Sequence, residues 1–154
     1  MIRVAINGYG RIGRSVLRAL YESDARSMVN VVAINELADC KTIGHLTRYD
    51  STHGRFPGTV EVSDDQLCIN GDSIAILHSE QIDQLPWGEL DIDVVLECSG
   101  AFADRATAQL HIDSGAKRVL FSQPADSDVD ATVVYGINHD TLSAQTKIIS
   151  NASC

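Results

Sequence analysis

The sequence predicts a doubly wound α/β fold, in which helices cover both faces of a mostly parallel sheet. Short apolar runs alternate along the chain with segments of helical periodicity. The runs 94–96 and 119–121 are apolar on both faces, which is typical of parallel strands buried between two helical layers. A glycine-rich turn closes the first apolar run, and ligands of doubly wound sheets lie at such turns.

The first half of that pattern is regular. Ile2–Asn7 is a strand that ends in the glycine-rich turn, and Arg11–Tyr21 follows with apolar residues near helical spacing. Val29–Asn35 is the second strand. A short helix is expected over Asp39–Tyr49, with Asp39 as its N-cap.

The middle of the chain changes period. Three short β-like runs occur at Val60–Val62, Gln66–Ile69 and Ser73–His78. Asn70-Gly71 separates the last two, and this dipeptide is a strong signal for a type I′ hairpin. The sequence therefore predicts a small antiparallel hairpin excursion from the main sheet.

The α/β alternation then returns. A strand at Asp93–Cys98 precedes a helix at Asp104–Ser114, and Gly115 is expected to end that helix. The remaining strands are predicted at Arg118–Phe121, Ala131–Tyr135 and Lys147–Ser150.

Composition restricts the function. A length of 154 residues fits one domain, and a net charge of −9 argues against a general electrostatic grip on nucleic acid or anionic membranes. No apolar stretch is long enough to span a bilayer. The four cysteines, at positions 40, 68, 98 and 154, form no Cys-x-x-Cys pair, so we expect no metal site. Free cysteines and an untargeted N-terminus favour a cytoplasmic location.

The strongest motif is a G-x-G-x-x-G at Gly8, Gly10 and Gly13, which closes a strand and opens a helix. Gly8 permits the tight turn, Gly10 lets the backbone approach a pyrophosphate, and Gly13 permits close helix–strand packing. The helix N-terminus supplies N–H groups for the phosphates. The motif predicts a Rossmann-type dinucleotide site, the alternative being a glycine-rich turn without a ligand.

A carboxylate follows the second strand. Glu36 lies 23 residues after Gly13, where an acidic side chain accepts hydrogen bonds from the adenosine ribose of NAD. It would repel the 2′-phosphate of NADP, and no Lys or Arg lies beside it. NAD is therefore the predicted cofactor. The alternative is a solvated acidic residue that caps the next helix.

Later strands also end in small polar residues. Ser99-Gly100 and Ser122 are expected near the nicotinamide half of the cofactor, because ligands lie at the carboxyl ends of parallel strands. Cys154 follows the last strand, where a helix would begin, with Ser153 in a capping-type position. A helix N-terminus lowers the pKa of a thiol, which makes Cys154 the candidate nucleophile. The other three cysteines are interpreted as packing or surface residues.

Four segments together resemble the glyceraldehyde-3-phosphate dehydrogenase superfamily. They are VAINGYGRIGR, YDSTHGRF, VVLECSG and ISNASC, and the resemblance runs from Ile2 to Cys154. Within the superfamily, INELAD, LPWGEL and DVDATVVYG resemble the D-erythrose-4-phosphate dehydrogenases. The alternative is a phosphorylating glyceraldehyde-3-phosphate dehydrogenase, in which Asp is usual at the place of Glu36.

The resemblance implies roles for individual residues. Arg11 and Ile12 would contact the pyrophosphate through their backbone. Cys154, with Ser153 close to the substrate, would attack a sugar phosphate aldehyde and form a thioester. Water would then release 4-phosphoerythronate, on the route to pyridoxal phosphate. The expected cofactor-binding residues are Asn7, Gly8, Gly10, Arg11, Ile12, Gly13, Glu36, Ser99, Gly100 and Ser122.

The resemblance also bears on domain organisation. Relatives are about twice as long, and their activating histidine and phosphate-binding groups lie in a second domain. We therefore expect residues 1–154 to be an NAD-binding domain that ends at the nucleophilic cysteine and is inactive alone. The complete enzyme is expected to be a homotetramer. A stand-alone dinucleotide-binding module is the alternative from another class. Glu80 stands where relatives often have a basic residue near the adenine.

Overall fold

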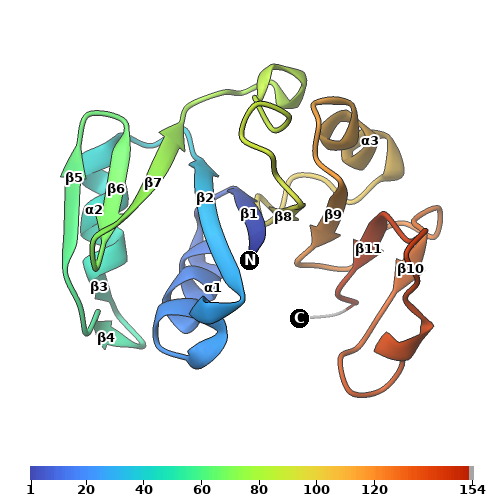
Figure 1. Cartoon of the computed structure of the whole chain (residues 1–154), viewed down its shortest axis with the longest axis horizontal. Coiled ribbons are helices and arrows are strands. Elements are labelled where there is room, and N and C mark those ends of the chain that lie inside the picture. Colours follow the sequence, from blue (N-terminus) through green and yellow to red (C-terminus); the bar gives the residue numbers. More distant parts are fainter. Residues whose placement is uncertain (153–154) are drawn as a thin grey trace.

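A nine-stranded sheet runs through residues 1–152, the part of the chain that the computed structural model describes (Figure 1). Its strands are β1 (Ile2–Asn7), β2 (Val29–Asn35), β5 (Val60–Ser63), β6 (Gln66–Ile69), β7 (Asp72–Leu77), β8 (Val94–Glu97), β9 (Arg118–Phe121), β10 (Ala131–Thr132) and β11 (Ile148–Ser150). A separate pair joins β3 (Tyr49–Asp50) to β4 (Gly54–Arg55). The helices are α1 (Arg11–Tyr21), α2 (Cys40–Arg48) and α3 (Arg105–Asp113), with 3₁₀ turns η1 (Asp24–Ser27), η2 (Ile82–Gln84) and η3 (His139–Thr141).

The order of the strands in the sheet is β10-β11-β9-β8-β1-β2-β7-β6-β5. From β10 to β7 neighbouring strands are parallel, whereas β5, β6 and β7 pair antiparallel. The chain winds outward from β1 in one direction through β2 and in the other through β8 and β9. This arrangement confirms the doubly wound α/β prediction, and it creates a topological switch point between β1 and β8.

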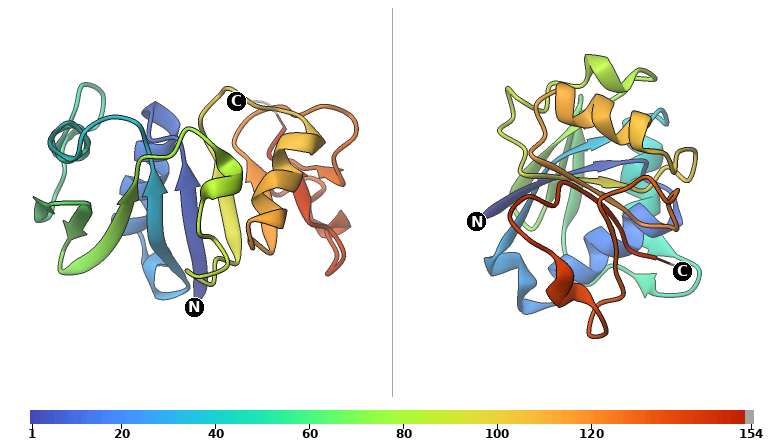
Figure 2. Two further views of the ribbon diagram at one scale, coloured as in Figure 1. Left: turned by 90° about the horizontal axis from the view of Figure 1, so that it is seen from above. Right: turned by 90° about the vertical axis from the view of Figure 1, so that its right-hand side faces the viewer.

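Helices cover both faces of the sheet, as the edge-on view in Figure 2 shows: α1 lies on one side and α3 on the other. Adjacent residues of β1 pack into the hydrophobic cores on opposite faces of the sheet. Ile6 packs with Leu17 of α1, whereas Ala5 packs with Trp87 and Val95 on the opposite face. The consecutive apolar residues Val4, Ala5 and Ile6 of β1 are all buried, as expected of a strand covered on both faces. No helix within residues 1–152 has the length and apolar content needed to cross a bilayer.

Local signals mark the element ends as expected. Asp39 and Asp104 are the N-caps of α2 and α3, and each carboxylate accepts the backbone N–H three residues on. The β6–β7 hairpin turns at Asn70 and Gly71, both with positive φ, as a type I′ turn requires. Gly115, also at positive φ, follows the end of α3.

Three predicted strands are shorter than expected. Asp93–Cys98 loses one residue at each end and Lys147–Ser150 loses its first residue, whereas the third loses three residues. The sequence predicts a strand over Ala131–Tyr135, but β10 ends at Thr132. The chain turns at this point because the Asn138 side chain accepts the N–H of Val134, and Gly136 has a φ of 86°. This side-chain-capped turn outweighs the β propensity of the Val-Val-Tyr run.

Candidate functional site

A pocket of about 370 Å³ opens at the switch point, between the carboxyl ends of β1, β2 and β8. Five of the predicted cofactor-binding residues line it: Asn7, Gly8, Gly10, Glu36 and Ser99. Residues from three separate strand ends therefore line one pocket, at the location where doubly wound sheets hold their ligands.

The three glycines of the motif stand in different surroundings. Gly8 has a φ of +91°, and a Cβ there would collide with the backbone of Ser99. A Cβ at Gly13 would collide with the carbonyl oxygen of Gly8, so this glycine permits the close approach of α1 to the turn. At Gly10 a Cβ would meet no described atom within 4 Å. Contacts within the described chain therefore explain why Gly8 and Gly13 must be glycines. At Gly10 no such contact exists, and the space beside it is open for a ligand.

The N-terminus of α1 adjoins this space. Gly10 is the N-cap of the helix, and within residues 1–152 no side chain caps the first backbone N–H groups at this position. Those N–H groups and the helix dipole favour an anionic ligand. The lack of a cap and the open position at Gly10 both fit the pyrophosphate of a dinucleotide.

Glu36 connects the end of β2 to the glycine turn. One carboxylate oxygen accepts the backbone N–H of Tyr9 at 2.8 Å, and the other accepts that of Leu37 at 2.8 Å. These bonds hold the carboxylate at the pocket wall. The backbone N–H of Ala38 also donates to the second oxygen, at 3.3 Å. Because a carboxylate offers about four acceptor positions, about one remains for a ribose hydroxyl.

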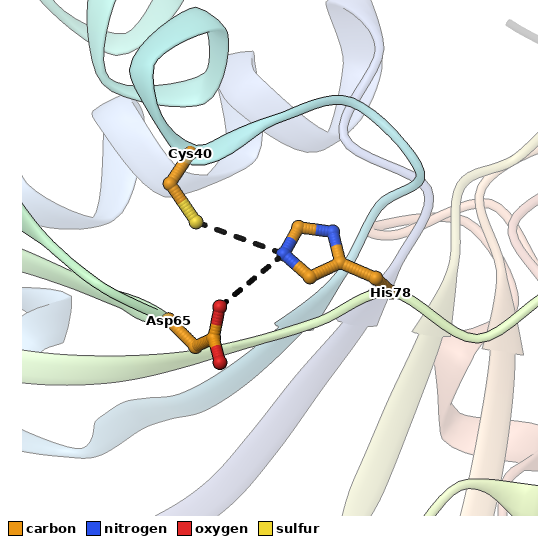
Figure 3. A group of neighbouring side chains, drawn as sticks. All are labelled: Cys40, Asp65 and His78. Carbon is orange, nitrogen blue, oxygen red and sulfur yellow. Dashed lines mark hydrogen bonds and ion pairs between the residues drawn. The ribbon is translucent and has the colours of Figure 1, made fainter.

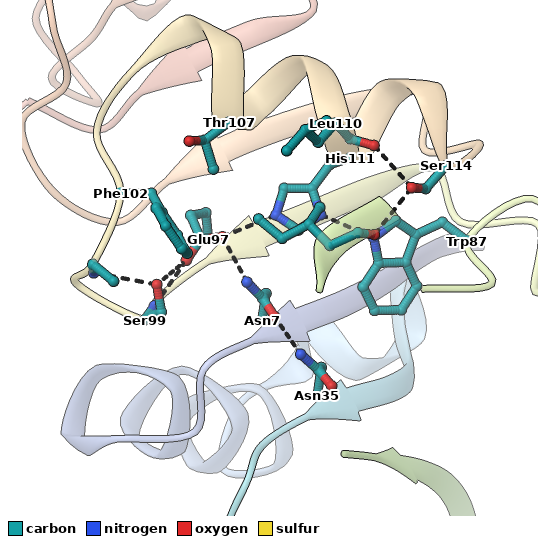
Figure 4. A network of polar contacts seen from close by, with 12 residues as sticks. Asn7, Asn35, Trp87, Glu97, Ser99, Phe102, Thr107, Leu110, His111 and Ser114 are labelled. Carbon is teal, nitrogen blue, oxygen red and sulfur yellow. Dashed lines mark hydrogen bonds and ion pairs between the residues drawn. The ribbon is translucent and has the colours of Figure 1, made fainter. Parts of the chain in front are cut away.

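A chain of buried hydrogen bonds forms the floor beneath the pocket (Figure 4). Asn35 Nδ2 donates to Asn7 Oδ1 at 2.8 Å, and Asn7 Nδ2 donates to Glu97 Oε2 at 2.7 Å. The same carboxylate oxygen lies 2.9 Å from His111 Nε2. The indole N–H of Trp87 donates to His111 Nδ1 at 2.9 Å. Because Nδ1 must accept from the indole, Nε2 carries the imidazole hydrogen and donates it to Glu97.

Glu97 is only 1 % exposed, yet its carboxylate has four donors. Besides Asn7 and His111, Ser99 supplies its backbone N–H at 3.0 Å and its hydroxyl at 2.5 Å. Burial alone would raise the pKa of Glu97, but the hydrogen bonds from His111, Ser99 and Asn7 hold that pKa below its ordinary value. The buried charge therefore positions Asn7 and Ser99, the two residues at the junction of β1 and β8.

Glu97 and His111 were not predicted as site residues from the sequence. A signal for Glu97 was present, because a carboxylate closes the otherwise apolar run Val94–Glu97 and a buried charge requires partners. His111 is fully buried on α3, and only the packing of that helix against the sheet reveals its partner. Glu80, which stands where relatives often have a basic residue near the adenine, lines the pocket. Phe102 also lines it and was not predicted from the sequence.

Other predicted residues lie near the pocket without lining it. Arg11 and Ile12 are exposed in the first turn of α1. Gly100, with a φ of 73°, follows Ser99. Ser122 follows β9, and its N–H donates to the Glu97 carbonyl at 3.1 Å. The proposed nucleophile Cys154 and its neighbour Ser153 lie outside the described residues.

Cys98 is a packing residue, as the sequence suggests. It is 8 % exposed and belongs to the core cluster between the sheet and α1. Burial raises the pKa of its thiol to about 11. The thiolate needed for nucleophilic chemistry is therefore scarce at neutral pH, although Cys98 lines the pocket.

A comparison with known protein families agrees with this geometry. The family model described as "Glyceraldehyde 3-phosphate dehydrogenase, NAD binding domain" matches residues 2–105. The matched segment includes the glycine motif, Glu36, Glu97 and Ser99, and so it covers the strand ends that surround the pocket.

Proposed function

The chain belongs to the glyceraldehyde-3-phosphate dehydrogenase family, and we propose that it is the cofactor-binding part of a dehydrogenase that oxidises D-erythrose 4-phosphate. NAD is the cofactor of this domain family. The observation that supports dinucleotide binding is the pocket at the β1–β8 switch point, which Glu36 and the glycine turn both line. The choice of D-erythrose 4-phosphate rests on the resemblance of the INELAD, LPWGEL and DVDATVVYG segments.

Different pocket residues contact different parts of the bound NAD in this proposal. Glu36 accepts a hydrogen bond from the adenosine ribose, and the N–H groups that follow Gly10, including those of Arg11 and Ile12, bind the pyrophosphate. Ser99, with Gly100 and Ser122 beyond it, lies toward the nicotinamide. When bound, NAD supplies the acceptor for the hydride that the aldehyde carbon loses.

Replacing Glu36 with alanine should change cofactor choice. We expect the variant to bind NAD about 10–100-fold more weakly, because hydrogen bonds to a charged group contribute about 1.5–3 kcal/mol. Binding of NADP should change little or improve, because the repulsion of the 2′-phosphate is lost. Titration calorimetry with both dinucleotides measures the ratio of affinities. A variant that keeps the wild-type ratio would show that Glu36 does not select the cofactor.

Cys154 provides the covalent chemistry in this proposal, on the strength of the ISNASC segment. Its sulfur adds to the aldehyde carbon and then holds the acyl group as a thioester. Water attacks the thioester carbonyl, the C–S bond breaks, and 4-phosphoerythronate leaves with the thiol restored. In a phosphorylating relative, inorganic phosphate would take the place of water and an acyl phosphate would leave. A homotetrameric, cytoplasmic enzyme on the route to pyridoxal phosphate is the corresponding expectation from the sequence resemblance.

The substrate can be tested with the complete natural enzyme. We expect faster reduction of NAD with erythrose 4-phosphate than with glyceraldehyde 3-phosphate, and no requirement for inorganic phosphate. Cys154→Ser should abolish turnover while NAD binding persists. The 154-residue chain alone should bind NAD without turnover. Faster, phosphate-dependent oxidation of the triose would identify a phosphorylating enzyme instead, and no turnover of either aldehyde would favour a dinucleotide-binding module.

A further inference from the structure

Three side chains with metal-ligand chemistry meet at the end of the sheet remote from β10 (Figure 3). Cys40 is the first residue of α2, Asp65 lies in the turn between β5 and β6, and His78 follows β7. The Cys40 sulfur is 3.6 Å from His78 Nε2, and that nitrogen is 3.8 Å from Asp65 Oδ1. All three ligand atoms lie within 4.8 Å of one another.

Packing of α2 against the hairpin brings these residues together. Gly44, on the turn of α2 that follows Cys40, faces Val62 of β5 so closely that a Cβ at Gly44 would collide with the valine side chain. This close approach sets the start of α2 above the β5–β6 turn. Asp65 and Cys40 therefore share one site although they are separated by 25 residues in the sequence.

The orientation of His78 is fixed by a second contact. Its Nδ1 lies 2.7 Å from the backbone carbonyl oxygen of Glu36. Since a carbonyl only accepts hydrogen bonds, Nδ1 carries the imidazole hydrogen, and the lone pair of Nε2 faces Cys40 and Asp65. Metal-binding histidines in proteins are held in the same way, with one ring nitrogen donating to a carbonyl or carboxylate and the other free to ligate.

The separation of Cys40 and His78 suits a tetrahedral ion, and Asp65 needs an adjustment. With Zn–S near 2.3 Å and Zn–N near 2.0–2.1 Å, tetrahedral angles place the sulfur and the nitrogen about 3.5–3.6 Å apart. The separation of Cys40 and His78 matches this value. The carboxylate of Asp65 needs a shift of about 0.4 Å to reach the spacing of about 3.4 Å that Zn–O and Zn–N bonds require. Its side chain is 80 % exposed, so solvent leaves it room to move.

Charge around the cluster also favours a cation. The carboxylates of Asp65, Asp39 and Asp64 lie close enough to the Cys40 thiol to act on it electrostatically. These carboxylates concentrate negative charge around one thiol and one imidazole. A mixed sulfur, nitrogen and oxygen donor set selects borderline-soft ions such as Zn²⁺ over Mg²⁺ and Ca²⁺, which prefer oxygen ligands alone.

We propose that Cys40, Asp65 and His78 form a three-ligand site for a borderline-soft divalent cation of the Zn²⁺ type. Three protein ligands leave the fourth tetrahedral position to water or another small ligand. No metal site was expected from the sequence, because the cysteines form no Cys-x-x-Cys pair. The ligands come instead from three elements that only the folded sheet brings together.

Cobalt(II) is the probe of choice, because a cysteine thiolate bound to Co²⁺ gives a near-ultraviolet charge-transfer band and tetrahedral Co²⁺ gives intense visible bands. The reduced, tag-free chain should bind one equivalent of Co²⁺ with both features, and Zn²⁺ should displace it. Cys40→Ser should remove the charge-transfer band. His78→Gln and Asp65→Asn should each weaken Co²⁺ binding by about tenfold or more.

Two matched controls separate this site from other thiols. Cys68→Ser replaces another half-buried cysteine, on β6, and Cys154→Ser replaces the proposed nucleophile; both should retain the bands. Asp65→Asn is nearly isosteric and exposed, so it reports on ligation without unfolding the chain. The proposal is overturned if the wild type shows no charge-transfer band, if Cys40→Ser keeps that band, or if only Cys154→Ser removes it.

Discussion

Replacing Glu97 with alanine should lower the free energy of unfolding by about 3–5 kcal/mol, a large share of the stability of a domain of this size. The variant leaves the buried amide of Asn7 and the imidazole N–H of His111 without their acceptor, together with two donors of Ser99. Buried donors that lose their partner incur the full cost of desolvation. Equilibrium unfolding in urea measures the loss.

Glu89 provides the matched control, because it is an exposed glutamate in the middle of the segment that joins η2 to β8. Glu89→Ala should change the free energy of unfolding by no more than about 0.5 kcal/mol. Equal effects of the two substitutions would contradict a structural role for the buried network. A loss of stability in Glu97→Ala but not in Glu89→Ala would show that the buried network beneath the pocket stabilises the fold.

The same carboxylate gives stability a pH dependence. The pKa of Glu97 in the folded chain lies below its ordinary value, so its stabilising effect is complete above the unfolded pKa of about 4.3. The effect is lost as the pH falls through the lower folded pKa. Stability of the wild type should therefore fall more steeply below about pH 4.3 than that of Glu97→Gln. Parallel curves would show that Glu97 is not linked to folding.

Replacing Gly10 with valine should weaken NAD binding by about 100-fold or more, equivalent to about 2.7 kcal/mol, while the chain stays folded. A side chain at Gly10 meets no described atom within 4 Å, so it would project into the space assigned to the pyrophosphate. The change also removes glycine from the N-cap of α1, which costs about 1 kcal/mol of stability. Titration calorimetry and thermal unfolding separate the two effects.

Val16 lies exposed further along α1 and serves as the control for Gly10. Val16→Ala should leave NAD affinity unchanged. If Gly10→Val binds NAD as tightly as the wild type, the pyrophosphate does not lie against this turn. If Gly10→Val unfolds, Gly10→Ala offers a smaller probe of the same space.

The parts of the fold that can be predicted from the sequence are those whose ends are marked by local sequence signals. The elements β1, α1, β2, β6 and β9 have the predicted bounds, because caps, hairpin residues and changes of apolar period mark their ends. The β10 region differs because the side chain of Asn138 captures the backbone of Val134. A side-chain-capped turn of this kind competes with a strand in a way that apolar patterning does not register.

In the candidate site too, residues within one local motif are predictable from the sequence, whereas residues joined only by the tertiary fold are not. The glycine motif and Glu36 are found from the sequence because their spacing is set by a single strand–helix–strand unit. The partners Glu97 and His111 are 14 residues apart, and Cys40 and His78 are 38 apart. Neither pair follows a short motif, so only the order of strands and the packing of helices on the sheet bring its members into contact.

NAD and NADP titrated separately into the wild-type chain, with the heat of binding recorded, test the central claim most directly. The pocket geometry predicts one NAD bound per chain, with an affinity at least about tenfold higher than that for NADP, because the carboxylate of Glu36 lies at the pocket wall. Equal affinities, or tighter binding of NADP, would contradict the assignment of Glu36 to the adenosine ribose. Absence of binding by either dinucleotide would contradict the proposed use of the pocket.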